Sequence, residues 1–146
     1  MDEKDSKILQ ELVADSRLSY REIARRVKLA AATVKSRVEN LEKNEVIKHY
    51  TTILDPEKVG YEVIAIIEIV VSKGKLIDVE ENLAKNPNVY AVYDVTGTSD
   101  AIIIVRFHRK EELSKFVKSI RVMENIERTV THYVLNVVKE DFRINI

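Results

Sequence analysis

The sequence predicts an α+β protein: an N-terminal three-helix, winged helix-turn-helix domain followed by a ferredoxin-like βαββαβ domain. Up to about Lys43, apolar residues recur at the spacing of an amphipathic helix. From Val46 onward, short runs of strand-forming residues alternate with helical segments. These two periods divide the chain into a helical domain over residues 1–45, a linking strand and turn over 46–60, and a second domain over 61–146.

Three apolar stripes predict the three N-terminal helices. The stripes consist of Ile8, Leu9, Leu12 and Val13; of Ile23, Ala24 and Val27; and of Ala31, Val34, Val38 and Leu41. Ser19 is followed three residues later by Glu22, which is the spacing of a capping box. The second helix is therefore expected to begin directly after Ser19.

The second half of the chain has the order of a split β-α-β fold. Its predicted strands cover residues 62–71, 89–97, 100–108 and 129–138, its predicted helices cover 75–86 and 110–120, and a linking strand over 46–54 precedes them. The order β-α-β-β-α-β is that of a ferredoxin-like domain, with both helices on one face of the sheet.

The other face of this sheet is expected to be polar, but it is not polar enough. Ile64 and Ile66 alternate with the core residues of one strand, and Ile102 and Ile104 do so on another. A second apolar face indicates that another copy of the chain covers it. The sequence thus predicts a homodimer or a higher, even-numbered homo-oligomer.

Composition excludes several classes of protein. The 146 residues include no cysteine, which excludes disulfides and thiolate metal sites. No signal peptide opens the chain and no apolar run approaches a membrane span, so a cytoplasmic protein without a membrane partner is expected. His49, His108 and His132 lack metal-ligand spacing, and no catalytic or cofactor motif occurs among the three glycines. We therefore predict no metal, no cofactor and no enzymatic activity.

Positive charge is concentrated on the second and third predicted helices. The chain has a formal net charge of zero, yet residues 17–43 carry eight basic and three acidic residues. At 100° per residue, the outer face of the third helix presents polar and small side chains that could enter a major groove of double-stranded DNA. The candidate DNA-contacting residues are Ser19, Arg21, Arg25, Ala31, Ala32, Thr33, Lys35, Ser36, Arg37 and Asn40. A solvated charged surface, or a surface that binds protein, is the alternative.

The third predicted helix and the segment after it carry a recognisable motif. The pattern Leu-x-x-x-Thr-Val-x-x-Arg-[Ile/Val]-x-x-Leu-Glu followed by Val-Ile is matched by Leu29, Thr33, Val34, Arg37, Val38, Leu41, Glu42, Val46 and Ile47. This motif resembles that of the Lrp/AsnC family of leucine-responsive transcription regulators. "YDVTGTSDAIIIV" looks like the G-x-x-D turn of the family's effector-binding domain, and "TVTHYVL" looks like its last strand. The resemblance spans nearly the whole chain and implies a DNA-binding regulator.

Three positions depart from the family pattern. The family usually has glycine in the helix-turn-helix turn, serine or a similar residue opening the recognition helix, and glycine before Val-Ile; here Lys28, Ala30 and Glu45 stand there. Alanine at an N-cap forgoes a bond worth about 1 kcal/mol. Fewer polar groups at the start of this helix also favour operator selection by DNA shape.

The resemblance also implies a site for a small, amino-acid-like effector. The residues it suggests are Gly97, Thr98, Ser99, Asp100, Thr129 and Thr131. Asp100 could pair with an ammonium group, although Gly-Thr-Ser-Asp is also ordinary turn chemistry.

Two other functions stay open at this point. Sirohaem decarboxylases look similar in both halves and would need His or Tyr side chains in the second domain, which His108, His132 and Tyr133 supply. A sequence-tolerant DNA-packaging protein would carry the same basic helices, but it would bind operator and random duplex alike.

Overall fold

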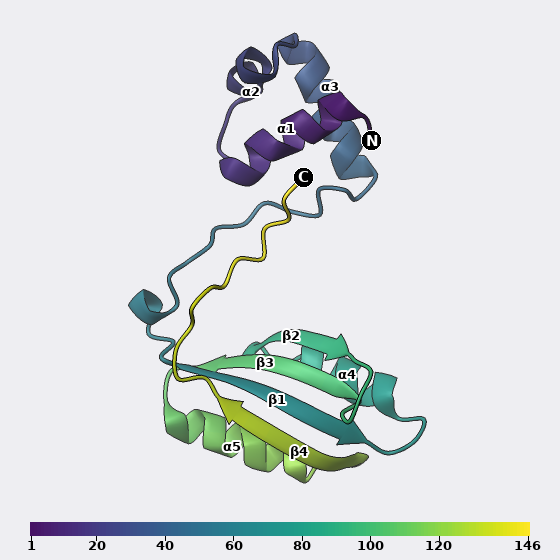
Figure 1. The fold of residues 1–146 in the computed structure, drawn as a ribbon, viewed down its shortest axis with the longest axis vertical. Coiled ribbons are helices and arrows are strands. Elements are labelled where there is room, and N and C mark those ends of the chain that lie inside the picture. The colour runs from purple at the N-terminus through teal and green to yellow at the C-terminus, as the bar shows by residue number, and fades with distance from the viewer. The chain divides into compact units, whose positions relative to one another are not determined.

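The computed structural model describes residues 1–146, which form two compact units (Figure 1). Residues 1–53 and 139–146 make up the first unit, and residues 54–138 make up the second. The sequence places residues 139–146 in the C-terminal domain, whereas in the structure they group with the helical unit. There the side-chain amide of Gln10 donates a hydrogen bond to the backbone oxygen of Ile146.

The first unit contains three helices: α1 (Glu3–Ala14), α2 (Tyr20–Val27) and α3 (Ala31–Lys43). The three predicted stripes meet in one core, whose buried members are Ile8, Leu12, Ile23, Ala24, Val34 and Val38. The predicted capping box is confirmed: Ser19 Oγ accepts the Glu22 amide, and the Glu22 side chain accepts the Ser19 amide. A second capping box joins Asp2 and Asp5 at the start of α1.

Two of the three departures from the family pattern fall where the backbone is left-handed. Lys28 has φ of 57° and Glu45 has φ of 55°. Only glycine adopts such angles without steric cost, which explains a glycine preference at both positions. The third departure, Ala30, is the N-cap of α3 and makes no side-chain capping bond.

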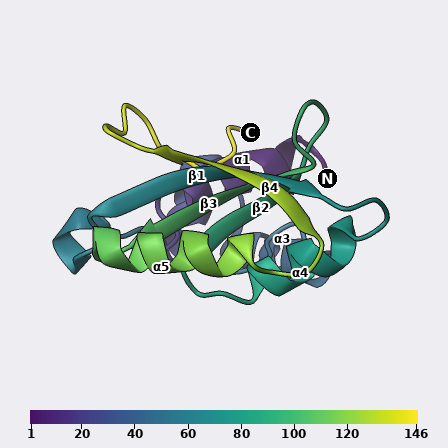
Figure 2. The same ribbon diagram turned by 90° about the horizontal axis from the view of Figure 1, so that it is seen from below.

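The second unit is a four-stranded antiparallel sheet with two helices. Its elements are η1 (Glu57–Val59), β1 (Val63–Val71), α4 (Leu76–Ala84), β2 (Val89–Asp94), β3 (Ala101–Phe107), α5 (Lys110–Arg121) and β4 (Ile126–Tyr133). The strand order is β2-β3-β1-β4, and α4 and α5 lie on the same face of the sheet, as Figure 2 shows. The predicted α+β class and βαββαβ order are therefore confirmed.

Burial alternates along β1 and β3 as the sequence predicts. Ala65, Ile67 and Ile103 are fully buried beneath the helices. The residues between them lie on the opposite face, which no helix covers; we call it the open face. Its apolar members are Ile64, Ile66, Val70, Ala91, Tyr93, Ile102, Ile104 and Val130.

Two strand predictions are corrected. Residues 46–54 form no strand, because a strand needs a hydrogen-bonded neighbour and none in this chain pairs with them. The last strand begins at Ile126 rather than at residue 129 and ends at Tyr133 rather than at 138. The extent of β4 is set by its pairing with β1, because β4 forms its hydrogen bonds with residues Ala65 to Val71 of that strand.

Candidate DNA-binding surface and effector site

The outer face of α3 carries the side chains predicted for DNA recognition. Ala32, Thr33, Lys35, Ser36 and Asn40 are all exposed. Four of them, Lys35 excepted, line a surface groove together with residues of the first turn of α1. The structure therefore presents small apolar and hydrogen-bonding side chains together, which are the kinds of group that contact base edges in a major groove.

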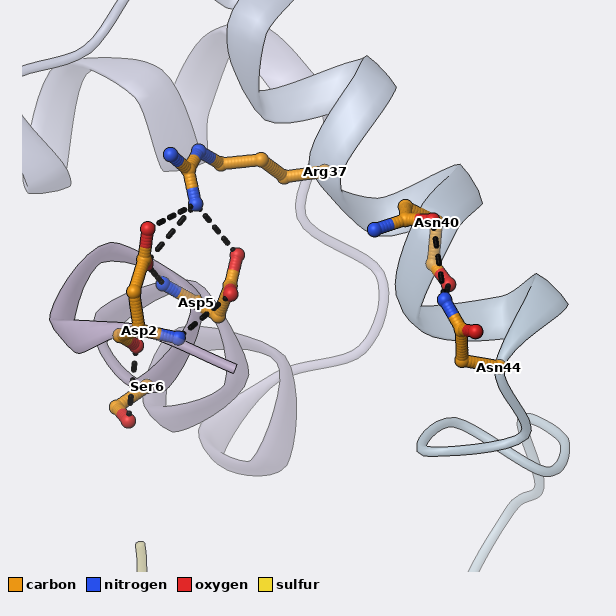
Figure 3. Close-up of polar contacts among 6 residues, drawn as sticks. All are labelled: Asp2, Asp5, Ser6, Arg37, Asn40 and Asn44. Atoms are coloured by element: carbon orange, nitrogen blue, oxygen red, sulfur yellow. Dashed lines mark hydrogen bonds and ion pairs between the residues drawn. The ribbon is translucent and has the colours of Figure 1, made fainter.

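Asn40 is partly committed within its own helix. Asn44 donates through Nδ2 to the Asn40 backbone oxygen at 2.7 Å and to Asn40 Oδ1 at 3.0 Å, as Figure 3 shows. The oxygen of the Asn40 amide is thus occupied. Its NH₂ group remains as a donor toward a base or phosphate acceptor.

Three predicted contacts have other roles in the structure. Ala31 is half-buried and packs against the helical core. The Ser19 hydroxyl donates to Glu22 Oε2 at 2.6 Å, and this bond, followed by the Ser19 amide, lowers the pKa of Glu22. Arg37 pairs with Asp2 and Asp5 on α1. The Ser19–Glu22 capping box follows from the sequence spacing, but a family motif or helical wheel does not reveal the partners of Arg37, because they lie at the start of the first helix.

The local positive charge is smaller than the sequence of residues 17–43 suggests. Arg26 pairs with Glu11 at 2.8 Å, and Arg17 pairs with Asp15 at 2.9 Å. Both carboxylates belong to the first helix or its end, outside that stretch. Arg21 and Arg25, which make no ion pair, remain exposed on α2 as candidates for phosphate contacts.

The turn between β2 and β3 holds four of the predicted effector residues. Gly97 has φ of 133°, which favours glycine, and Thr98 is exposed. The Asp100 carboxylate accepts a hydrogen bond from the Val71 amide at 2.8 Å. Asp100 therefore has the structural role of a turn residue that joins the hairpin to β1, and only one of its carboxylate oxygens is used in that bond.

Ser99 belongs to a polar network on the open face. Its hydroxyl donates to Glu68 Oε2 at 2.7 Å, and Glu68 Oε1 lies 2.8 Å from His132 Nε2. The hydrogen bond from Ser99, and then that from His132, lowers the pKa of Glu68. Glu68 is not among the predicted site residues, although an acidic residue that alternates with isoleucines on a strand is a detectable signal.

Thr129 and Thr131 do not join this network. They pair across the sheet with the buried residues Ile69 and Ile67, so their side chains lie on the helix-covered side of β4. There they line a small cavity with Arg121 and Val117 of α5. Within one chain, Thr129 and Thr131 therefore lie on the opposite face of the sheet from Ser99 and its network, while Gly97, Thr98 and Asp100 belong to the turn beyond the strands.

The side chains considered for an enzyme make separate contacts. His108 Nδ1 lies 2.7 Å from the Gly60 oxygen, and its ring stacks on Tyr61 with centroids 4.1 Å apart. His132 contacts Glu68, while the Tyr133 ring faces the ammonium group of Lys110. Each of these groups has its own structural partner. No helix has both the length and the apolarity needed to cross a bilayer.

Two family models match the two halves of the chain. Residues 1–48 match a winged helix-turn-helix DNA-binding model, and residues 64–144 match the Lrp/AsnC ligand binding domain. These ranges contain the exposed face of α3 and the hairpin with Gly97 and Asp100.

Curated relatives cover almost the whole chain. An uncharacterised HTH-type transcriptional regulator of Pyrococcus furiosus is 44% identical over 144 residues, which are 99% of this chain and 97% of that protein. The HTH-type transcriptional regulator FL11 of Pyrococcus horikoshii is 39% identical over 96% of this chain and 93% of its own length.

Solved structures share the fold along nearly the full length. A transcriptional regulator of Neisseria meningitidis in complex with L-Met superposes with a TM-score of 0.90 at 27% identity and covers 99% of this chain and 96% of its own. LrpC of Bacillus subtilis gives a TM-score of 0.84 at 29% identity and covers 97% of this chain and 99% of its own. These matches favour a regulator over a sirohaem decarboxylase, and the chain is a member of the Lrp/AsnC family of helix-turn-helix transcription regulators.

Proposed function

We propose that this regulator acts in the cytoplasm as a homodimer, or a higher even-numbered oligomer, that binds double-stranded DNA in a sequence-specific manner through α2 and α3. The observation that carries the proposal is the exposed face of α3, where Ala32, Thr33, Ser36 and Asn40 lie together without burial. Arg21 and Arg25 on α2 supply unpaired positive charge for the DNA backbone. A dimer with two such helices suits half-sites about one helical turn, roughly 34 Å, apart or a multiple of it.

The exposed apolar residues of the open face support the proposed dimer. The face exposes Ile66 and Val130 at 36% and 38%, and Tyr93 at 46%. Covering it removes apolar area from water at about 25 cal/mol per Å². The Ser99–Glu68–His132 network supplies the polar pairing that charged groups on such a face require before they can be covered.

Substitution of basic residues on the two helices separates base reading from backbone contact. Lys35→Ala is expected to weaken binding to a selected operator by about 1–3 kcal/mol if Lys35 reads a base. Arg25→Ala is expected to weaken all duplexes alike and to reduce the salt slope by about 1. Fluorescence anisotropy over a salt series, with operators first selected from a random pool, measures both effects.

Lys73→Ala, in the turn after β1, is the matched control for loss of one positive charge. If neither helix variant differs from this control, α2 and α3 do not bind DNA. Equal wild-type affinity for operator and random duplex would instead identify a DNA-packaging protein.

We further propose that a small amino-acid-like effector binds at the hairpin with Gly97, Thr98, Ser99 and Asp100, with Thr129 and Thr131 as the other suggested contacts. The relative from Neisseria meningitidis, solved with L-Met, supports an amino acid as the chemical class. Because Thr129 and Thr131 lie on the opposite face of the sheet from Ser99 in one chain, they would come from a neighbouring subunit. Regulation follows only if the effector binds one assembly state more tightly than another.

Two variants of Asp100 separate its role in effector binding from its structural hydrogen bond to Val71. Asp100→Ala is expected to lower the free energy of unfolding by about 1–3 kcal/mol, because the part-buried Val71 amide loses its acceptor. Asp100→Asn keeps an acceptor oxygen and removes the negative charge that would pair with an ammonium group. A thermal-shift screen of amino acids at millimolar concentration is expected to find a ligand that stabilises the wild type but not Asp100→Asn. Equal stabilisation of both proteins would remove Asp100 from the site.

A further inference from the structure

Arg37 of the recognition helix is held by two carboxylates at the start of α1. Its Nη1 atom lies 2.9 and 2.8 Å from the two carboxylate oxygens of Asp2, and 2.7 Å from Asp5 Oδ1. Figure 3 shows the guanidinium with Nη1 directed at both carboxylates and its other two nitrogens directed away from them. The Arg37 side chain is 27% exposed and that of Asp5 only 15%, so this pair is partly shielded from water, whereas the Asp2 side chain is 55% exposed.

The same two carboxylates also cap α1. Asp2 Oδ1 accepts the Asp5 amide at 2.9 Å, and Asp5 Oδ2 accepts the Asp2 amide at 2.8 Å. The Asp5 amide, followed by Arg37, lowers the pKa of Asp2, which keeps its carboxylate charged. The capping box and Arg37 thus form one unit that joins the first turn of α1 to the middle of α3; we call it the clamp.

The start of α3 lacks the anchors that would otherwise fix it. Ala30 provides no capping bond, and no acidic residue lies in the first turn of the helix. Lys28, in the turn before it, is held in a left-handed conformation. The clamp is therefore the polar restraint on α3 that lies beside its groove-lining face.

The clamp restrains α3, but the negative charge of its two carboxylates acts against DNA binding. Asp2 and Asp5 line the same groove as Thr33, Ser36 and Asn40. Within the clamp itself, two carboxylates against one guanidinium leave a net negative charge, which repels the phosphates of DNA. Charge alone predicts that neutralising either aspartate strengthens DNA binding.

We propose that Asp2 and Asp5 are positioning residues for DNA binding: they hold Arg37 by Nη1, so that Nε and Nη2 are presented to an acceptor on DNA and α3 is fixed beside it. A guanidinium has donors along more than one edge, so it can bind a carboxylate with one edge and a phosphate with another. The inference rests on the proposed DNA-binding function. It predicts that neutralising either aspartate weakens DNA binding, whereas charge repulsion alone predicts that it strengthens DNA binding.

Asp2→Asn tests the clamp with little damage to α1. Asparagine caps helices about as well as aspartate, so the variant keeps an acceptor for the Asp5 amide while it loses the charge that holds Arg37. The full-length variant is expected to bind duplex DNA about three- to tenfold more weakly than the wild type, a modest coupling for residues in contact. Its salt slope is expected to fall by about 1, as it should also for Arg37→Ala, because Arg37 no longer reaches the phosphate.

Glu39→Gln is the matched control, because Glu39 lines the same groove but pairs with Lys35 at 3.7 Å instead of with Arg37, so its loss removes a negative charge and frees Lys35. It is expected to bind as tightly as the wild type or more tightly. Circular dichroism and melting temperature establish that each variant is folded, and Asp5→Asn provides a second, independent variant. Aspartate variants that are folded and bind as tightly as the wild type overturn the clamp, while the Lys35 and Arg25 effects still report on DNA binding. A wild-type protein that binds no duplex removes the proposed function and this inference together.

Discussion

Replacing Ile66 with aspartate is expected to convert the proposed dimer to monomers. Ile66 is in the middle of β1 on the open face, flanked across the sheet by Ile104 and His132. At 36% exposure it tolerates a charge in the monomer, where water still reaches the carboxylate. In the proposed dimer, the carboxylate of each subunit would be buried without a partner, at a cost of several kcal/mol per subunit, and every 1.4 kcal/mol weakens association about tenfold.

Analytical ultracentrifugation at micromolar concentration measures this change directly. Ile77→Asp is the matched control: it makes the same substitution at a residue that is 70% exposed near the start of α4, away from the open face. The control is expected to keep the wild-type mass, since an acidic residue in the first turn of a helix is favourable. An Ile66→Asp protein with an unchanged mass would show that the open face is not the interface.

Loss of the dimer is also expected to weaken operator binding far more than any single contact does. Two recognition helices on one particle bind two half-sites at a high effective concentration, whereas a monomer binds each half-site separately. The Ile66→Asp protein should therefore keep weak binding to duplex DNA with no preference for paired half-sites. The same anisotropy assay on operators with one or two half-sites tests this consequence.

Replacing Ile23 with alanine is expected to unfold the helical unit and abolish DNA binding while the dimer persists. Ile23 is fully buried in the core that α1, α2 and α3 share. Isoleucine-to-alanine changes in a core cost about 2–5 kcal/mol. A small three-helix unit with six buried residues in this core has only a small margin of stability.

Circular dichroism should show a loss of helix signal at a temperature where the sheet unit remains folded, and the solution mass should stay that of the wild type. Ile23→Val, which removes a single methylene, serves as the control and is expected to cost about 0.5–1.5 kcal/mol. Unchanged melting and DNA affinity in Ile23→Ala would mean that the assembly, rather than this core, holds the helical unit together.

Features that depend on neighbours in sequence were predictable. The stripes of the three helices and the alternation of β1 follow from periods of 3.6 and 2.0 residues. The capping box follows from the three-residue spacing of Ser19 and Glu22. The positive φ of Lys28 and Glu45 falls where the family pattern has glycine. Each of these features is set by bonds or packing within a few residues.

Features that depend on distant residues were not predictable in the same way. Arg37 meets Asp2 and Asp5 only after α1 and α3 have packed, and Ser99 meets Glu68 only after β1 and β3 have paired. Residues 46–54 have strand composition but no strand, because backbone pairing needs a neighbour that composition does not supply.

By itself, the sequence determined the two-part architecture, the exposed face of α3 and the second apolar face of the sheet. The spacing of apolar residues predicts these features because it indicates which side chains face a core and which face away from it. Only the tertiary structure decided how charge is distributed over those faces. Carboxylates from α1 neutralise Arg26 and Arg37, and the sheet register separates Ser99 from Thr131. Charge interactions act through space within about 10 Å, so the partners of a charged residue depend on the packing of elements and not on distance along the chain.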